Sequence, residues 1–154
     1  MIIDGIAALT AALFNKGLIM TNEAEVIENK LSQIVDLIEA PADNWWQIGI
    51  AAIELADLYN RADCEVDWSH DLCDDVEPFD LVAALYWHFS DYSEGQASHS
   101  YRVQCALSNI YQPSVYETSE GAEHSEAYHS LYKLLADKER LDHAGWCRRG
   151  KPTR

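Results

Sequence analysis

The fold is decided by residues 45–61, which read WWQIGIAAIELADLYNR. Nearly all of these residues are apolar. The polar exceptions fall mostly along one narrow stripe of a helix: Gln47, Glu54, Asp57, Asn60 and Arg61. Because a helix that is apolar on most of its sides is buried on most of them, this stretch predicts a central helix, with Asn44 as its N-cap.

Helical periodicity continues on both sides of this stretch. Apolar residues at Ile27, Leu31, Ile34, Val35 and Ile38 predict a helix that starts near residue 22 and ends before the proline at 41. A proline at 78 suits a first helical turn and starts a second largely apolar helix, to about residue 92. Further helices are predicted over residues 3–15, 97–111 and 122–143. No segment alternates with the period of two that marks a strand.

We therefore expect an all-α fold, a single compact domain of about six helices over residues 1–144 with little or no sheet. Residues 145–154 are expected to form a short, basic and flexible tail. The apolar fraction of 48% is too high for a disordered chain, despite the charge.

The charge is strongly acidic and unevenly distributed. The chain has 26 Asp and Glu against 11 Lys and Arg, a net charge of -15. Residues 1–136 carry 23 acids and 5 bases, a net of -18, and the last 18 residues return +3. The stretch from 63 to 80 holds 8 carboxylates and no Lys or Arg. Such a field repels nucleic acid and anionic membranes and attracts basic surfaces.

The expected function is that of a non-enzymatic interaction protein that docks on a basic site of another protein, with no direct binding to nucleic acid or membrane. The predicted partner-binding residues are Asp63, Glu65, Asp67, Trp68, Asp71, Asp74, Asp75 and Glu77. Among them, Trp68 would supply buried contact. No catalytic residue, metal or cofactor is predicted. The plainer alternative is that the charge only maintains solubility.

A charge estimate suggests one kind of partner. A compact chain of this length has a diameter of roughly 40 Å. A duplex of that length carries on the order of 23 negative charges. The net -18 of residues 1–136 is of the same order, so this protein could act as an inhibitor or nucleic-acid-mimicking decoy.

A second pattern pairs carboxylates on two predicted helices. Glu25-x-x-Glu28 is followed, after 25 intervening residues, by Glu54-x-x-Asp57. A spacing of three places two carboxylates on one helix face, and Mg²⁺ prefers such oxygen ligands. The pattern, which covers residues 25–57, resembles the ExxE…ExxD motif of the MazG-like all-α nucleoside triphosphate pyrophosphatases. This resemblance implies that the four acids hold Mg²⁺ against substrate phosphates, and it supplies the alternative function.

Two further metal patterns depart from their templates. Six residues fall at the ligand positions of an EF-hand-like loop: Asp63, Glu65, Asp67, Ser69, Asp71 and Asp74. However, Trp68 stands where that loop requires Gly, and Asp74 stands where it uses Glu. Another set could be arranged around zinc, but its spacing fits no known ligand knuckle: Cys64, His70, Cys73 and His88.

Other side chains carry simpler expectations. The four cysteines, without a basic signal segment at the N-terminus, indicate reduced thiols and a cytoplasmic location, and Cys105 is expected in the core. His99 is expected at the surface or at a helix end. Trp45 and Trp46 are adjacent and point 100° apart on a helix. Either both are buried on a two-sided central helix, or one lies at its edge.

Overall fold

The computed structural model describes residues 23–62, 64–72, 75–93, 95 and 98–148, without the side chains of 145–148. This part of the chain contains a helix over residues 23–39 and four more: α2 (Trp45–Arg61), α3 (Pro78–Asp91), α4 (His99–Leu107) and α5 (Glu126–Arg148). Within the described ranges, the one β-type pairing is an isolated antiparallel bridge between His70 and Val76. The all-α prediction is confirmed. The helix predicted over residues 3–15 and residues 149–154 of the predicted tail lie outside the described residues.

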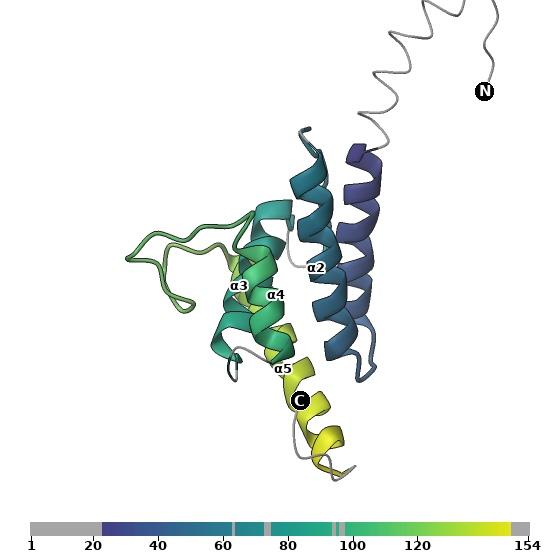
Figure 1. The fold of residues 1–154 in the computed structure, drawn as a ribbon, viewed down its shortest axis with the longest axis vertical. Helices are drawn as coiled ribbons and strands as arrows, with labels where there is room; N and C mark the ends of the chain where they lie inside the picture. Colours follow the sequence, from purple (N-terminus) through teal and green to yellow (C-terminus); the bar gives the residue numbers. More distant parts are fainter. Residues whose placement is uncertain (1–22, 63, 73–74, 94, 96–97, 149–154) are drawn as a thin grey trace, which may run out of the picture.

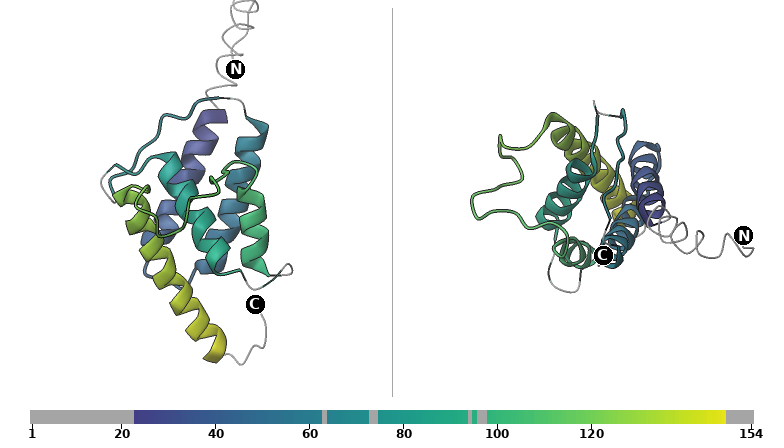
Figure 2. Two further views of the ribbon diagram at one scale, coloured as in Figure 1. Left: turned by 90° about the vertical axis from the view of Figure 1, so that its left-hand side faces the viewer. Right: turned by 90° about the horizontal axis from the view of Figure 1, so that it is seen from above.

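The helices pack as a bundle with one oblique member. Helix 23–39 and α2 run antiparallel and side by side (Figure 1), and a salt bridge of 2.9 Å joins Lys30 to Glu54 across them. α4 packs on α2 and α3, and α5 packs on α3 and α2. The views in Figure 2 show α5 crossing the bundle obliquely, with its C-terminal part extending past the other helices. None of the described helices is long and apolar enough to cross a membrane.

The two adjacent tryptophans at the start of α2 have different environments. Trp45 is 2% exposed, stacks on Phe89 at 5.2 Å between ring centroids, and donates its indole N–H to His88 Nε2 at 2.8 Å. Trp46 is 40% exposed and stacks on His99 at 3.7 Å. Of the two alternatives, the structure therefore has one tryptophan in the core and one at the edge.

The last two helices begin where serine caps them. Ser98 Oγ accepts from the backbone N–H of Tyr101 at 3.1 Å, and Ser125 Oγ accepts from that of Tyr128 at 3.0 Å. Each serine satisfies an N–H group that has no partner within its own helix. For this reason α4 begins at His99, not at 97, and α5 begins at Glu126, not at 122.

A buried lysine ties the last helix to the first. Lys138 on α5 is 6% exposed, and its Nζ donates to Ala42 O at 2.7 Å and to Ala40 O. These carbonyls follow the end of helix 23–39, where a cation is favourable. Burial lowers the pKa of the Lys138 ammonium from its ordinary value.

One prediction about α4 is wrong. Cys105, expected in the core, is exposed, because the buried side of α4 is formed by Val103 and Leu107, each two residues away. His99, expected at the surface or at a helix end, is the first residue of α4, where it is only 5% exposed and its Nε2 lies 3.1 Å from Trp46 O. A Cβ atom on Gly49 would lie 2.3 Å from this ring nitrogen, so the glycine is what leaves room for the imidazole.

Candidate protein-docking face

The segment between α2 and α3 lies against the first described helix. We call the described residues of 62–77 the connector. Trp68 donates its indole N–H to Ser32 Oγ of helix 23–39 at 2.9 Å, and its ring is partly buried against the core. The backbones of His70 and Val76 exchange hydrogen bonds of 3.0 and 2.8 Å, and Val76 is fully buried. These contacts hold the connector on the helix surface.

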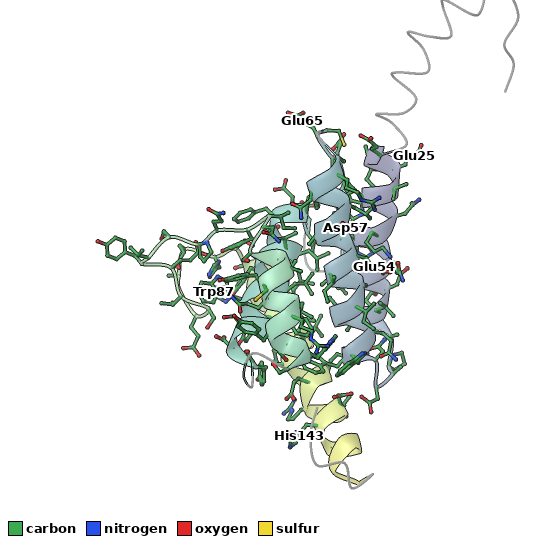
Figure 3. All side chains as sticks on the ribbon, in the orientation of Figure 1. Glu25, Glu54, Asp57, Glu65, Trp87 and His143 are labelled. Atoms are coloured by element: carbon green, nitrogen blue, oxygen red, sulfur yellow. The ribbon has the colours of Figure 1, made fainter. Side chains whose placement is uncertain are left out.

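This packing brings two acidic stretches of the sequence together. The stripe of helix 23–39 that contains Glu25, Ser32 and Glu39 borders the connector, as the Trp68–Ser32 bond and the proximity of His70 to Glu39 show. Figure 3 places Glu25 and Glu65 at the same end of the molecule. We define the acidic face as the exposed or half-exposed carboxylates of this stripe and of the connector: Glu25, Glu28, Asp36, Glu39, Glu65, Asp67, Asp71, Asp75 and Glu77.

The nearby cations are engaged elsewhere. Lys30 and Arg61 are the only Lys or Arg from residue 23 to residue 101. Lys30 binds Glu54, and Arg61 binds Asp57 at 2.9 Å, so both cations lie with carboxylates of α2. Among the described residues, the charged contacts of the acidic face are those of the His70 imidazole with Glu39 and Asp71. Apart from the buried ammonium of Lys138 on Ala40 O and Ala42 O, the described residues at this face present a negative field.

The predicted partner-binding residues have three kinds of position. Exposed carboxylates of the connector form one group: Glu65, Asp67, Asp71, Asp75 and Glu77. Trp68 is half-buried and fastens the connector, so only part of its ring is left for a partner. Asp63 and Asp74 lie outside the described residues, which also leaves the EF-hand-like pattern incomplete.

One cluster has the residue types of a metal site. Ligand atoms of Asp36, Glu39 and His70 lie within 4.8 Å of one another. However, His70 Nδ1 is 3.0 Å from the backbone N–H of Leu72 and accepts its hydrogen. In the neutral ring Nε2 then carries the hydrogen and faces Glu39 Oε1 at 3.7 Å. A metal at Nε2 would require the other tautomer, so the arrangement suits a ring–carboxylate contact better than coordination.

His88, which the sequence analysis considered as a zinc ligand together with Cys64, His70 and Cys73, is a core residue. It is fully buried and bound to Trp45. Burial lowers the pKa of its imidazole from 6.5 to about 3.

No three of the four carboxylates of the MazG-like pattern, all of which are described, have ligand atoms within 4.8 Å of one another. Glu54 binds Lys30 of helix 23–39, and Asp57 binds Arg61 of its own helix. Within the described residues, the one group of three potential ligands closer than 4.8 Å is that of Asp36, Glu39 and His70.

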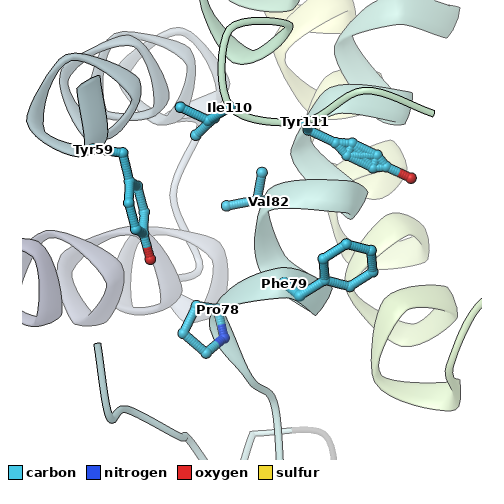
Figure 4. Close-up of a pocket in the computed structure, with 6 residues that line it drawn as sticks. All are labelled: Tyr59, Pro78, Phe79, Val82, Ile110 and Tyr111. Atoms are coloured by element: carbon cyan, nitrogen blue, oxygen red, sulfur yellow. The ribbon is translucent and has the colours of Figure 1, made fainter. Parts of the chain in front are cut away.

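The sequence interpretation missed an apolar groove and an anchored loop. The groove lies at the start of α3, where Phe79 is 67% exposed (Figure 4). The loop before α5 is held by Glu117, whose Oε2 accepts from Trp87 Nε1 at 2.9 Å and from the hydroxyl of Tyr111. An aromatic residue directly after the helix-starting proline was the available signal for the groove.

Comparison of the chain with protein-family models, with curated proteins and with solved structures found no match in any of the three. Functional interpretation therefore depends on the charge and geometry of the described residues. The described residues form an all-α bundle with a surface of exposed carboxylates along helix 23–39 and the connector.

Proposed function

We propose that this protein is a non-enzymatic interaction protein that docks on a basic surface of another protein through its acidic face. The observation that carries the proposal is the packing of the connector on helix 23–39 through Trp68 and Ser32. This packing joins two separate acidic stretches in one surface, while Lys30 and Arg61 pair with carboxylates of α2.

The charge of the face acts mainly on the encounter. A predominantly negative field steers a basic partner toward this side of the molecule and raises the association rate. Because exposed charges are screened over about 8–10 Å at physiological salt, binding should weaken as salt is added. A protein whose own ligand is nucleic acid fits this description best, so that the chain acts as a decoy or inhibitor. The net -18 of residues 1–136 supports this choice of partner.

The test measures how fast the full-length chain associates with a synthetic peptide rich in Lys and Arg, at low and at high salt. Asp67→Asn combined with Asp71→Asn removes two exposed charges of the acidic face. We expect a slower association at low salt and a weaker salt dependence. Glu120→Gln combined with Glu126→Gln is the matched control, because it removes the same charge from exposed positions outside the face. Equal slowing by both double variants would mean that only net charge matters.

The alternative function is that of a Mg²⁺-dependent nucleoside triphosphate pyrophosphatase. What favours it is that the two helices that carry its four acids are antiparallel neighbours, joined by Lys30 and Glu54. A panel of nucleotides with Mg²⁺, assayed for released pyrophosphate, tests this alternative. Turnover that disappears in Glu54→Gln would replace the docking proposal with the enzyme.

A further inference from the structure

An apolar groove opens beside the acidic face. It has a volume of about 140 Å³ and is lined by residues of α2, of α3 and of the turn after α4: Tyr59, Pro78, Phe79, Val82, Ile110 and Tyr111 (Figure 4). Two-thirds of the Phe79 side chain is exposed at its edge. Burial raises the pKa of the Tyr59 hydroxyl to about 12, as expected for a phenol withdrawn from water.

The groove is large enough for a single aromatic side chain. An apolar cavity of about 150 Å³ holds one benzene molecule, whereas drug-sized ligands occupy about 300–1,000 Å³. The lining also continues a series of ring contacts. Phe79 and Tyr111 have centroids 5.6 Å apart, and Tyr111 stacks on Tyr86 at 5.1 Å. A further aromatic ring at Phe79 would extend this series, and aromatic pairs of this kind are favourable beyond the area that they bury.

The charged residues beside the groove favour one charge on the peptide segment that brings an aromatic ring into it. Glu77 directly precedes Pro78 and is exposed, as is Asp75. No Lys or Arg occurs from residue 62 to residue 101, and the nearby Arg61 is paired with Asp57. A segment entering the groove therefore meets carboxylates, which favour flanking Lys or Arg and disfavour flanking Asp or Glu.

We infer that the groove is an anchor pocket that binds one aromatic side chain from a basic segment of the partner protein. The inference rests on the proposed function for the basic character of that segment. It adds a desolvated apolar contact, which is the kind of contact that holds a complex together once charges have steered it. The same charge argument disfavours a second copy of this chain, because two acidic surfaces would meet.

The experiment measures equilibrium binding of short fluorescent peptides to the full-length chain by anisotropy at low salt. The first peptide has one phenylalanine flanked on both sides by lysines and arginines. The second has alanine in its place, and the third keeps the phenylalanine but has glutamines for the basic residues. We expect the first to bind about tenfold more tightly than the second, which corresponds to about 1.4 kcal/mol. The third should bind most weakly.

Two variants assign the effect to the groove. Phe79→Ala should abolish the difference between the first two peptides, and exposure of Phe79 makes the substitution compatible with folding. Leu141→Ala is the matched control, since Leu141 is 58% exposed on α5, away from the groove lining. It should leave the difference unchanged.

Every remaining outcome would contradict the anchor pocket, the proposed function or the identity of the bound segment. Equal affinity for the two basic peptides overturns the anchor pocket and leaves the proposed function standing, whereas no binding of either removes both. Tighter binding of the first peptide by the full chain with Leu9→Ser and Leu13→Ser, which leave the charge unchanged, would assign the groove to the N-terminal segment of this chain. Concentration-dependent dimers that disappear in Phe79→Ala would assign it to a second copy.

Discussion

The buried imidazole of His88 makes acid stability a sharp test of the core. Its side chain is fully buried between α2, α3 and α5, with Trp45 Nε1 donating to Nε2 and the rings of Tyr92 and Tyr132 at 4.7 and 5.8 Å. Nδ1 has no hydrogen-bond partner in the described part of the protein. No group hydrogen-bonded to this ring can stabilise a positive charge. Desolvation accordingly lowers the pKa of His88 from 6.5 to about 3.

The sign of the effect follows from the two pKa values. Above about pH 6.5 His88 is neutral in both the folded and the unfolded state, so it contributes no pH dependence. Below that pH, His88 is protonated in the unfolded chain but stays neutral in the folded chain. The free energy of unfolding therefore falls by about 1.4 kcal/mol for each pH unit of acidification. Between about pH 6.5 and pH 4 the loss is about 3 kcal/mol, a large part of the 5–15 kcal/mol typical of a domain.

The assay compares urea unfolding of the wild type and of His88→Gln over this pH range. Glutamine does not titrate, and its carbonyl can still accept the Trp45 N–H, so the variant should lose the acid-sensitive part of the slope. Acidic groups titrate in both proteins and cancel in the difference. His129→Gln is the control, because His129 is an exposed histidine of α5. Parallel pH profiles for the wild type and His88→Gln would refute the reasoning.

Three further substitutions test contacts within the bundle. Gly49→Ala usually stabilises a helix by about 1 kcal/mol, but the 2.3 Å approach of its Cβ to the buried His99 ring should reverse the sign and cost about 1–3 kcal/mol in thermal unfolding. Lys138→Met removes the donor to two carbonyls and should cost about 1–3 kcal/mol in urea unfolding, so an unchanged midpoint would contradict the role of this ammonium. Glu117→Gln weakens the acceptor of Trp87 Nε1 and should speed proteolysis within the loop of residues 112–121, while global stability falls by no more than about 1.5 kcal/mol.

Much of the fold could be predicted because apolar periodicity determines which helix faces are buried. The stripe from Ile27 to Ile38 is buried as the pattern predicts, and α2 has its predicted bounds. Helix starts were less accurate where a serine cap competed with neighbouring residues, as at Ser125. His99 could not be assigned to the interior, because its place depends on Gly49, which lies on another helix.

The sequence predicts which connector residues are exposed acids, but not how the connector packs against the rest of the protein. Counting acids identifies the connector, since Glu65, Asp67 and Asp71 are exposed in the structure. No local pattern predicts that the connector folds onto helix 23–39, because that packing depends on contacts between residues far apart in the sequence, such as Trp68 with Ser32 and His70 with Glu39. The contribution of helix 23–39 to the face, and the groove beside it, were consequently missed.

The distribution of the charges separates docking from solubility better than their total does. A coat that only maintains solubility needs acids on every side, and it is more effective when opposite charges are interspersed. Here α5 carries Lys133, Lys138 and Arg140 among its acids, whereas residues 62–101 have none of these cations. Under the proposed function, we therefore expect a basic partner arriving by diffusion to be oriented toward the connector before contact. The connector ends at Glu77, which directly precedes Pro78 and the exposed Phe79 at the edge of the groove. We therefore expect steering by charge and anchoring in the groove to act at neighbouring places, which a uniformly acidic coat would not achieve.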